Sequence, residues 1–214
     1  MKTNLTELVF ILDKSGSMCG LEEQTICGFN RMIEEQKKLE GEVLVSTFLF
    51  SDEPVMIHSR LEIEKVPRLT LKNYQTDGCT ALLDTVGKAI DHISTLHKNL
   101  SPEIRPNKTL FVITTDGEEN ASVFYTYKKI RSMINRQKTK YGWEFLFLAS
   151  DIKVEENARR LGVSQNRAVS YDKLDQTEEI YCCLSSCVSD YRKHGALADD
   201  LSNSFKKKSK KKPN

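Results

Sequence analysis

Apolar residues recur at two alternating spacings along the chain, which predicts strands and helices in turn. Runs that are apolar at nearly every position, at Glu7–Leu12, Glu42–Phe50 and Lys108–Thr115, are typical of strands covered on both faces. Between Leu82 and Leu96 the apolar residues fall three or four positions apart, which predicts a long amphipathic helix. Further helices are expected at 21–39, 123–134, 154–161 and 177–192, and further strands at 54–58, 143–149 and 168–171.

Strands that alternate with helical segments of this length predict repeated βαβ units. The expected fold class is therefore α/β: a doubly wound, mostly parallel central sheet with helices on both faces, as in a Rossmann fold, and one antiparallel edge strand at 54–58. The segment 61–75 fits neither spacing and is expected to form an edge element and a loop. We find no internal repeat and no domain boundary before about Leu201. Residues 1–200 are therefore expected to form one domain, and 201–214 a lysine-rich, disordered tail.

Charge is distributed unevenly along the 214 residues. The formal net charge is +2, yet six lysines lie within the last nine residues, and without them 26 Lys and Arg stand against 30 Asp and Glu. The body of the protein is therefore mildly acidic. The lysine run is either a nucleic-acid contact through phosphates or a solvated terminus. Because only Phe205 offers a ring for base stacking there, nucleic acid is not the partner that we expect.

No segment has the length of a signal peptide or a membrane span. The apolar stretch Leu8–Leu12 ends at Asp13, whereas a spanning helix needs roughly 20 apolar residues. We therefore expect a cytoplasmic protein with no membrane contact, and cysteines that remain thiols. Cys183 and Cys187 share one stripe of a predicted helix, which favours core packing over metal binding.

Oxygen-bearing side chains occur where the predicted strands end. Asp13 ends the first strand, Ser15 and Ser17 lie in the turn that follows, and Asp116 directly follows the strand 108–115. Thr80 lies in the loop before the long helix. In doubly wound sheets, ligands bind at the carboxyl ends of the strands, so these five side chains are expected to lie near one point. Asp13, Ser17 and Thr80 also have a simpler interpretation as helix caps.

Two carboxylates and three hydroxyls form an all-oxygen set, which suits a hard cation such as Mg²⁺ or Mn²⁺. Two carboxylates neutralise the ion at most, so a further coordination position would favour a carboxylate from outside the chain.

At these residues the sequence resembles the von Willebrand factor type A (vWA) family, whose hallmark is the metal-ion-dependent adhesion site (MIDAS). The family's first motif is matched by Asp13, Ser15 and Ser17, its threonine by Thr80, and its second aspartate motif by Asp116 with Gly117. More narrowly, the chain is similar to small stand-alone bacterial and phage-type members. The resemblance spans roughly Leu5–Tyr191.

The resemblance implies a divalent ion held directly by Ser15, Ser17 and Thr80, with Asp13 and Asp116 binding directly or through water. It also implies a partner protein whose Glu or Asp completes the metal shell, with ATPase-type proteins as one partner class. Glu118 and Glu119 add negative charge beside the site, which is expected to tighten metal binding and repel an acidic partner.

The main alternative is a Mg²⁺-dependent hydrolase or phosphatase-like enzyme that uses the same ion. The sequence lacks the second aspartate of an Asp-x-Asp phosphatase motif, the glycines of a phosphate-binding loop and a Gly-x-Ser-x-Gly elbow. Its four histidines have no chelating spacing and are expected at the surface or its boundary. We therefore expect a binding module and not an enzyme.

Overall fold

The computed structural model describes residues 4–150, 154–171, 177–199 and 201. Six strands form one sheet in the order β3-β2-β1-β4-β5-β6. All neighbouring pairs are parallel except β2 and β3, which are antiparallel. The predicted class, including the antiparallel edge strand, is confirmed. The strands are β1 (Thr6–Asp13), β2 (Val43–Phe50), β3 (Pro54–Glu62), β4 (Lys108–Thr115), β5 (Glu144–Ala149) and β6 (Ala168–Ser170).

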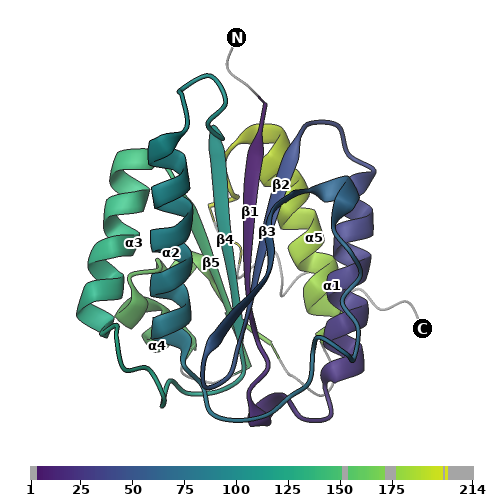
Figure 1. Ribbon diagram of the computed structural model, residues 1–214, viewed down its shortest axis with the longest axis vertical. Coiled ribbons are helices and arrows are strands. Elements are labelled where there is room, and N and C mark those ends of the chain that lie inside the picture. The colour runs from purple at the N-terminus through teal and green to yellow at the C-terminus, as the bar shows by residue number, and fades with distance from the viewer. Residues whose placement is uncertain (1–3, 151–153, 172–176, 200, 202–214) are drawn as a thin grey trace.

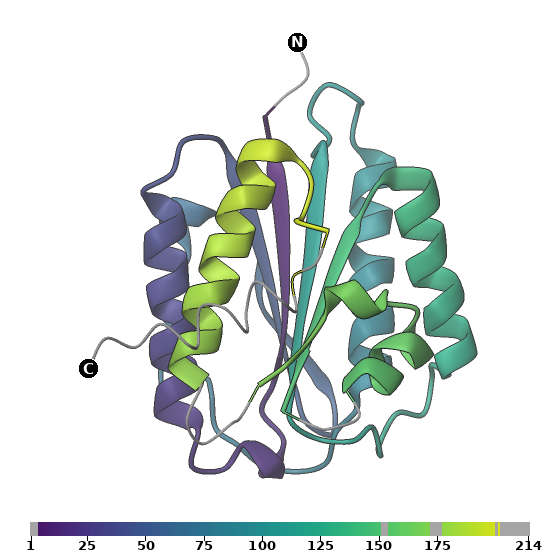
Figure 2. The same ribbon diagram turned by 180° about the vertical axis from the view of Figure 1, so that it is seen from behind.

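Helices cover both faces of the sheet, which makes a three-layer molecule (Figures 1 and 2). One face is packed by α1 (Glu22–Lys37) and α5 (Thr177–His194), and the other by α2 (Leu82–Asn99), α3 (Tyr127–Tyr141) and α4 (Val154–Leu161). Short 3-10 turns lie at Gly16–Met18, Ile63–Lys65 and Gln165–Arg167.

Strand β1 shows why its sequence is apolar at consecutive positions. Leu8 and Phe10 point into the core beneath α1 and α5, whereas Val9 and Ile11 point into the core beneath α2 and α3. Because successive side chains of a strand face opposite sides, a sheet with helices on both faces needs apolar residues at every position. The apolar run of β1 stops at Asp13, the last residue of the strand.

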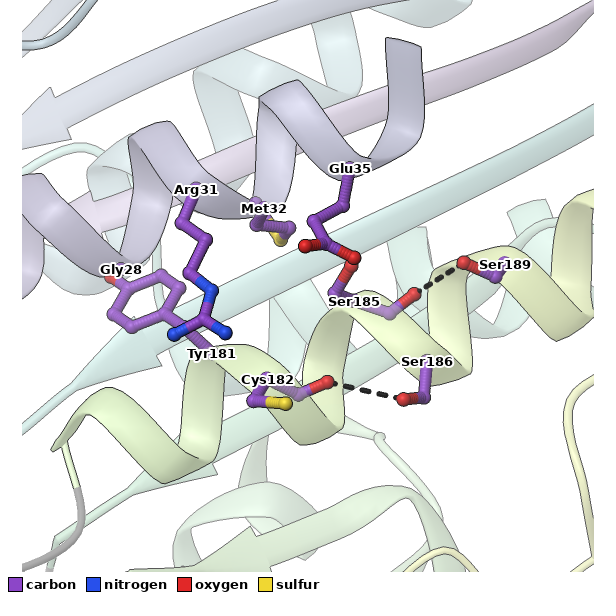
Figure 3. Close-up of a pocket in the computed structure, with 9 residues that line it drawn as sticks. All are labelled: Gly28, Arg31, Met32, Glu35, Tyr181, Cys182, Ser185, Ser186 and Ser189. Carbon is purple, nitrogen blue, oxygen red and sulfur yellow. Dashed lines mark hydrogen bonds between the residues drawn. The ribbon is translucent and has the colours of Figure 1, made fainter. Parts of the chain in front are cut away.

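Helices α1 and α5 pack closely, and a buried polar contact joins them near the end of α1. A Cβ added to Gly28 on α1 would lie 2.3 Å from a ring carbon of Tyr181 on α5, so this helix contact requires glycine. Figure 3 shows the Tyr181 ring beside Gly28, next to a small cavity of about 130 Å³ between the two helices. The Gln36 side chain donates to the Ser185 carbonyl oxygen at 2.9 Å and to Ser189 Oγ at 2.9 Å.

The start of one helix differs from the expectation, whereas the segment 61–75 forms an edge element and a loop, as expected. Helix α3 begins at Tyr127 behind the cap Thr126, so Val123 lies outside the helix and is 81% exposed. Its spacing matched the helical period, but the backbone there is held by Asp84 instead. The segment 61–75 extends β3 to Glu62 and then continues as a 3-10 turn and a loop, whose inward residues complete the core beneath α1: Ile63, Val66, Leu69 and Tyr74.

Three smaller expectations have distinct outcomes. Leu201 is 2% exposed and packs in the core, and 202–214 lie outside the described residues, so the expected domain limits stay a prediction. Cys183 and Cys187 are buried on α5, as predicted. His58 and His97 are buried, which contradicts the expected surface position, because each finds a polar partner inside, Thr47 and Glu7 respectively.

Within the described residues, no helix combines the length and the apolar character needed to cross a membrane.

Candidate metal centre

Three loops meet where β1 and β4 end, at the lower edge of the molecule in Figure 1. Main-chain hydrogen bonds join the loop after β1 to the loop before α2, from Gly16 N to the Gly78 oxygen at 3.0 Å and from Asp77 N to the Lys14 oxygen at 2.9 Å. The loop before α2 is joined to the loop after β4 through Thr80, described below. The backbone therefore brings the five predicted side chains to one place (Asp13, Ser15, Ser17, Thr80 and Asp116, hereafter the five-residue site).

The hydroxyls of Ser15 and Ser17 lie beside the Asp116 carboxylate. Ser15 Oγ and Ser17 Oγ are 3.0 Å apart, and Ser17 Oγ donates to Asp116 Oδ1 at 2.5 Å. Neighbouring ligands of an octahedral Mg²⁺ ion are about 3 Å apart, because each oxygen lies about 2.1 Å from the ion. The serine pair thus has the separation of two adjacent magnesium ligands.

Gly117 shows that three hydroxyls surround one point. A Cβ built on Gly117 would lie 2.9 Å from Thr80 Oγ1, 3.1 Å from Ser17 Oγ and 3.7 Å from Ser15 Oγ. These oxygens come from two loops and face the backbone of a third. The space beside Gly117 is therefore a cradle of oxygen atoms that a single methyl group would fill.

Asp13 lies behind the hydroxyls and is 1% exposed. Its Oδ1 accepts from Ser15 N at 2.7 Å, and its Oδ2 accepts from Thr115 Oγ1 at 2.6 Å. Burial raises the pKa of the Asp13 carboxyl, and the hydrogen bonds from Ser15 and Thr115 offset part of that rise. A divalent cation nearby would favour the ionised form, so Asp13 is suited to orient the loop and to balance a metal's charge.

Several residues that support the site were not predicted. Asn120 accepts from Thr80 N through Oδ1 at 2.8 Å, and its own N–H donates to the Thr80 oxygen at 3.1 Å. The Tyr74 hydroxyl donates to the Asp13 carbonyl oxygen. Asp52 accepts from Cys79 N at 2.8 Å and lies against Gly78, whose φ of +75° favours glycine. Only Gly78 left a local signal, because the other partners come from distant segments.

Glu119 does not act as the sequence suggested. Its carboxylate accepts from Leu83 N at 2.8 Å, which caps the start of α2, and from Ser122 N and Oγ, both at 2.8 Å. Its charge therefore offsets the positive end of the α2 dipole. The expected repulsion of an acidic partner by Glu119 is correspondingly reduced, whereas Glu118 remains exposed.

The donor set fits a hard divalent cation better than a soft one. Among the described residues, no group of three or more His, Cys, Asp or Glu side chains is placed to hold a metal. The five-residue site instead has two carboxylates and three hydroxyls, all of them oxygen donors, which suits Mg²⁺ or Mn²⁺.

No protein-family model matches the sequence, and no curated protein matches it either. Solved structures do match. Proximal thread matrix protein 1 from the mussel byssus, in a structure with a zinc-occupied MIDAS motif, aligns with a TM-score of 0.59 and 12% identity, over 88% of this chain and 47% of that one.

Two further matches agree. A von Willebrand factor type A protein from Catenulispora acidiphila aligns with a TM-score of 0.55 and 12% identity, over 88% of this chain and 43% of that one. The pilus adhesin SpaC from Lactobacillus rhamnosus GG, in an open conformation, aligns with a TM-score of 0.62 and 14% identity, over 89% and 30%. The chain thus has the fold of a vWA domain, and it spans less than half the length of each of these three proteins.

Proposed function

We propose that this chain is a non-enzymatic interaction module that uses a divalent metal ion to bind an acidic group of a partner protein. The observation that carries the proposal is the convergence of the Ser15, Ser17 and Thr80 hydroxyls on the space beside Gly117. These three side chains would hold Mg²⁺ or Mn²⁺ directly, and Asp13 and Asp116 would bind directly or through water.

The charge of the site supports an acidic ligand. Three hydroxyls donate little charge, so Asp13 and Asp116 at most neutralise a divalent ion and leave it electrophilic. A Glu or Asp from another protein would then replace a bound water favourably. The zinc-occupied MIDAS of the mussel protein supports metal binding by this fold, and the adhesin match supports a protein partner.

The histidines support binding over catalysis. In the described part of the chain, the hydrogen-bond partners of three histidines lie outside the five-residue site: Thr47 for His58, Ser59 for His92 and Glu7 for His97. Acid–base chemistry there would have to use a carboxylate such as Asp116, which the proposal assigns to the metal ion. The proposal also retains the cytoplasmic location and the ATPase-type partner class expected from the sequence.

An exposed apolar pair lies on the loop that leaves the site. Val123 and Phe124 are 81% and 70% exposed, although their backbone is fixed. Asp84, in the first turn of α2, accepts from the N–H groups of Val123, Phe124 and Tyr125 at 2.8–2.9 Å. A rigid loop that presents two large apolar side chains to solvent is typical of a contact surface. Lys88 lies over the Phe124 ring and would favour an acidic segment.

The metal dependence of partner binding tests the proposal. The immobilised chain is expected to capture a protein from its native extract in Mg²⁺, and to release it in EDTA. Asp116→Asn keeps the side-chain size but removes a ligand charge, so capture should fall by about tenfold or more. The control Asp199→Asn changes an exposed carboxylate that follows α5, and this variant should capture the protein normally. Capture that survives both EDTA and Asp116→Asn would contradict the proposal.

Phe124→Ser should weaken capture of the same protein and leave Mg²⁺ affinity unchanged. Full burial of this ring by a partner is worth about 2 kcal/mol, or roughly thirtyfold in affinity. Ile104→Ser is the matched control, because Ile104 is 56% exposed and lies at the opposite end of the sheet. Binding curves by surface plasmon resonance, with calorimetric Mg²⁺ titration of each variant, separate the two effects. Equal partner affinity of the two variants would exclude Phe124 from the contact.

A further inference from the structure

Basic side chains gather on helix α3, although the body of the protein is mildly acidic. The helix has six Lys and Arg and no Asp or Glu among its 15 residues: Lys128, Lys129, Arg131, Arg136, Lys138 and Lys140. Helix α1, which covers the other face of the sheet, has four glutamates against Arg31 and Lys37. The two faces of the molecule therefore differ in charge, and α3 lies along one side edge in both views (Figures 1 and 2).

The six cations lie in two rows, one on each side of the outward-facing ridge of α3. The ridge is the stripe opposite the buried positions of the helix and carries only uncharged polar residues: Ser132, Asn135 and Thr139. The helical period places three cations on each flank: Lys129, Arg136 and Lys140 on one, and Lys128, Arg131 and Lys138 on the other. All of them except the half-buried Lys138 are exposed. Each row extends for about 15 Å along the helix.

The cations of α3 have no carboxylate partner within the described part of the chain, because none of the ion pairs there includes any of the six. Lys129 Nζ instead lies 4.0 Å from the centre of the Tyr125 ring. Lys138 donates to Ser164 Oγ at 2.9 Å. Contacts with a ring or a hydroxyl leave the positive charge in place, so the helix presents this charge to its surroundings.

The charge pattern of α3 opposes the stability of the helix itself. Lys128 and Lys129 lie in the first turn, where the positive end of the helix dipole disfavours cations, and that turn has no acidic residue. Arg136 and Lys140 are four positions apart, so their like charges repel each other on one flank. Because both features weaken the helix, the fold does not account for the six cations. A polyanionic ligand would account for them.

The surface of α3 matches nucleic acid better than an acidic protein or a membrane. Interfaces between proteins are poor in lysine and centred on apolar anchors, and helices that bind membranes expose an apolar face. Helix α3 instead buries Ile130 and Ile134 and exposes cations beside small hydrogen-bonding side chains; its one exposed large ring, Tyr141, is the last residue of the helix. Interfaces with DNA are more polar and much more positively charged than those between proteins.

We propose that the exposed side of α3 binds the phosphate backbone of double-stranded DNA. The two rows of cations would contact the phosphates that border one groove, because a helix about 10 Å across separates them and the major groove of B-DNA is about 12 Å wide. The uncharged ridge would face the groove between them. Contacts to phosphates are electrostatic, so binding would be independent of base sequence, and the lysine run at 206–212 would add to it.

The fluorescence anisotropy of a labelled duplex of about 20 base pairs, titrated with the full chain in EDTA, tests the proposal. EDTA removes any metal from the five-residue site, so this proposal and the metal-dependent function fail independently. We expect roughly micromolar affinity at about 50 mM salt, and a slope of about −4 to −5 when log K is plotted against log salt, because about five phosphates release their counterions. No saturable binding, or a slope near zero, would overturn the proposal.

A triple variant locates the contact on α3. Lys128→Gln, Arg136→Gln and Lys140→Gln together remove three exposed cations from both rows. The affinity for the duplex should fall by about tenfold or more, and the salt slope should become less steep by about 3. The melting temperature should not fall, because the substitutions relieve repulsion between like charges. Unchanged affinity and slope would refute the proposal.

The matched control removes the same charge from the α1 side of the molecule. Lys38→Gln, Arg68→Gln and Lys72→Gln change exposed residues at the end of α1 and in the loop beneath it, and should bind within about threefold of the unmodified chain. A further variant with glutamine for the six lysines of 206–212 measures the share of the tail. Binding lost in that variant and kept in the α3 variant would overturn the proposal.

Competition identifies the class of ligand. Poly-glutamate, vesicles with phosphatidylserine and duplex RNA are each added to the complex at equal anionic charge. We expect each to displace the labelled DNA less well than unlabelled duplex DNA does, because B-DNA combines a high charge density with a groove of the matching width. Better displacement by poly-glutamate, by the vesicles or by RNA would assign α3 to an acidic protein, a membrane or RNA respectively, and would contradict the proposal.

Discussion

Gly117→Ala is expected to weaken Mg²⁺ binding by at least about a hundredfold, close to 3 kcal/mol, while the protein stays folded. The added methyl group would occupy the space among the Thr80, Ser17 and Ser15 hydroxyls, within 2.9–3.7 Å of each oxygen. Gly117 does not adopt a left-handed backbone, so alanine adds bulk without backbone strain. Calorimetric titration of MgCl₂ into the purified chain measures the loss.

The control for this variant is another glycine-to-alanine change. Gly142 caps α3 with a φ of +67°, and an added Cβ there would meet no atom within 4 Å. Gly142→Ala should therefore lower the free energy of unfolding by about 1 kcal/mol through backbone strain and leave Mg²⁺ affinity unchanged. If Gly117→Ala binds Mg²⁺ as tightly as Gly142→Ala, the metal does not occupy the hydroxyl cradle.

Arg192→Met should produce the largest loss of stability, about 3 kcal/mol, or roughly 6–12 °C in melting temperature. Arg192 is 5% exposed on α5, and its guanidinium donates to main-chain oxygens at the end of α1. These acceptors are the carbonyl oxygen of Gln36, in the last turn of α1, and those of Leu39, Glu40 and Gly41, which follow the helix. Methionine would fill much of the space but would remove all the hydrogen bonds that the guanidinium donates to these oxygens.

The neighbouring residue supplies the matched control. Lys193 is exposed on the same helix turn, so Lys193→Met removes one positive charge without breaking a buried contact. Its free energy of unfolding should change by no more than about 0.5 kcal/mol. Thermal and urea unfolding followed by circular dichroism compares the two variants. Equal melting temperatures would show that the α1–α5 contact does not depend on the guanidinium.

The sequence was sufficient for the strands and for the placing of the five-residue site. Both faces of β1 are buried, so its apolar run is unbroken, and the run stops where Asp13 begins the loop. Asp116 follows β4 in the same way, and β1 and β4 are parallel neighbours. A polar residue that directly follows an apolar strand can therefore be placed at the carboxyl edge of the sheet from the sequence alone. Metal binding by these side chains stays a prediction.

Contacts between distant segments were beyond the sequence. Glu119 bonds to Leu83 N, 36 residues away, and Asp84 bonds to Phe124 N, 40 residues away. Neither carboxylate differs locally from a solvated one, so the sequence alone indicates neither the capping role of Glu119 nor the non-helical backbone at Val123.

The Asp84 carboxylate holds the loop that carries Val123 and Phe124 by its main-chain N–H groups, and the exposed side chains of the loop do not contribute to these hydrogen bonds. Substitutions at these two positions consequently cost the fold little, whereas Asp84 cannot be exchanged without releasing the loop. Evolution and protein engineers alike can vary the pair to redirect recognition while the rest of the domain, including the metal-binding chemistry proposed for it, is inherited unchanged.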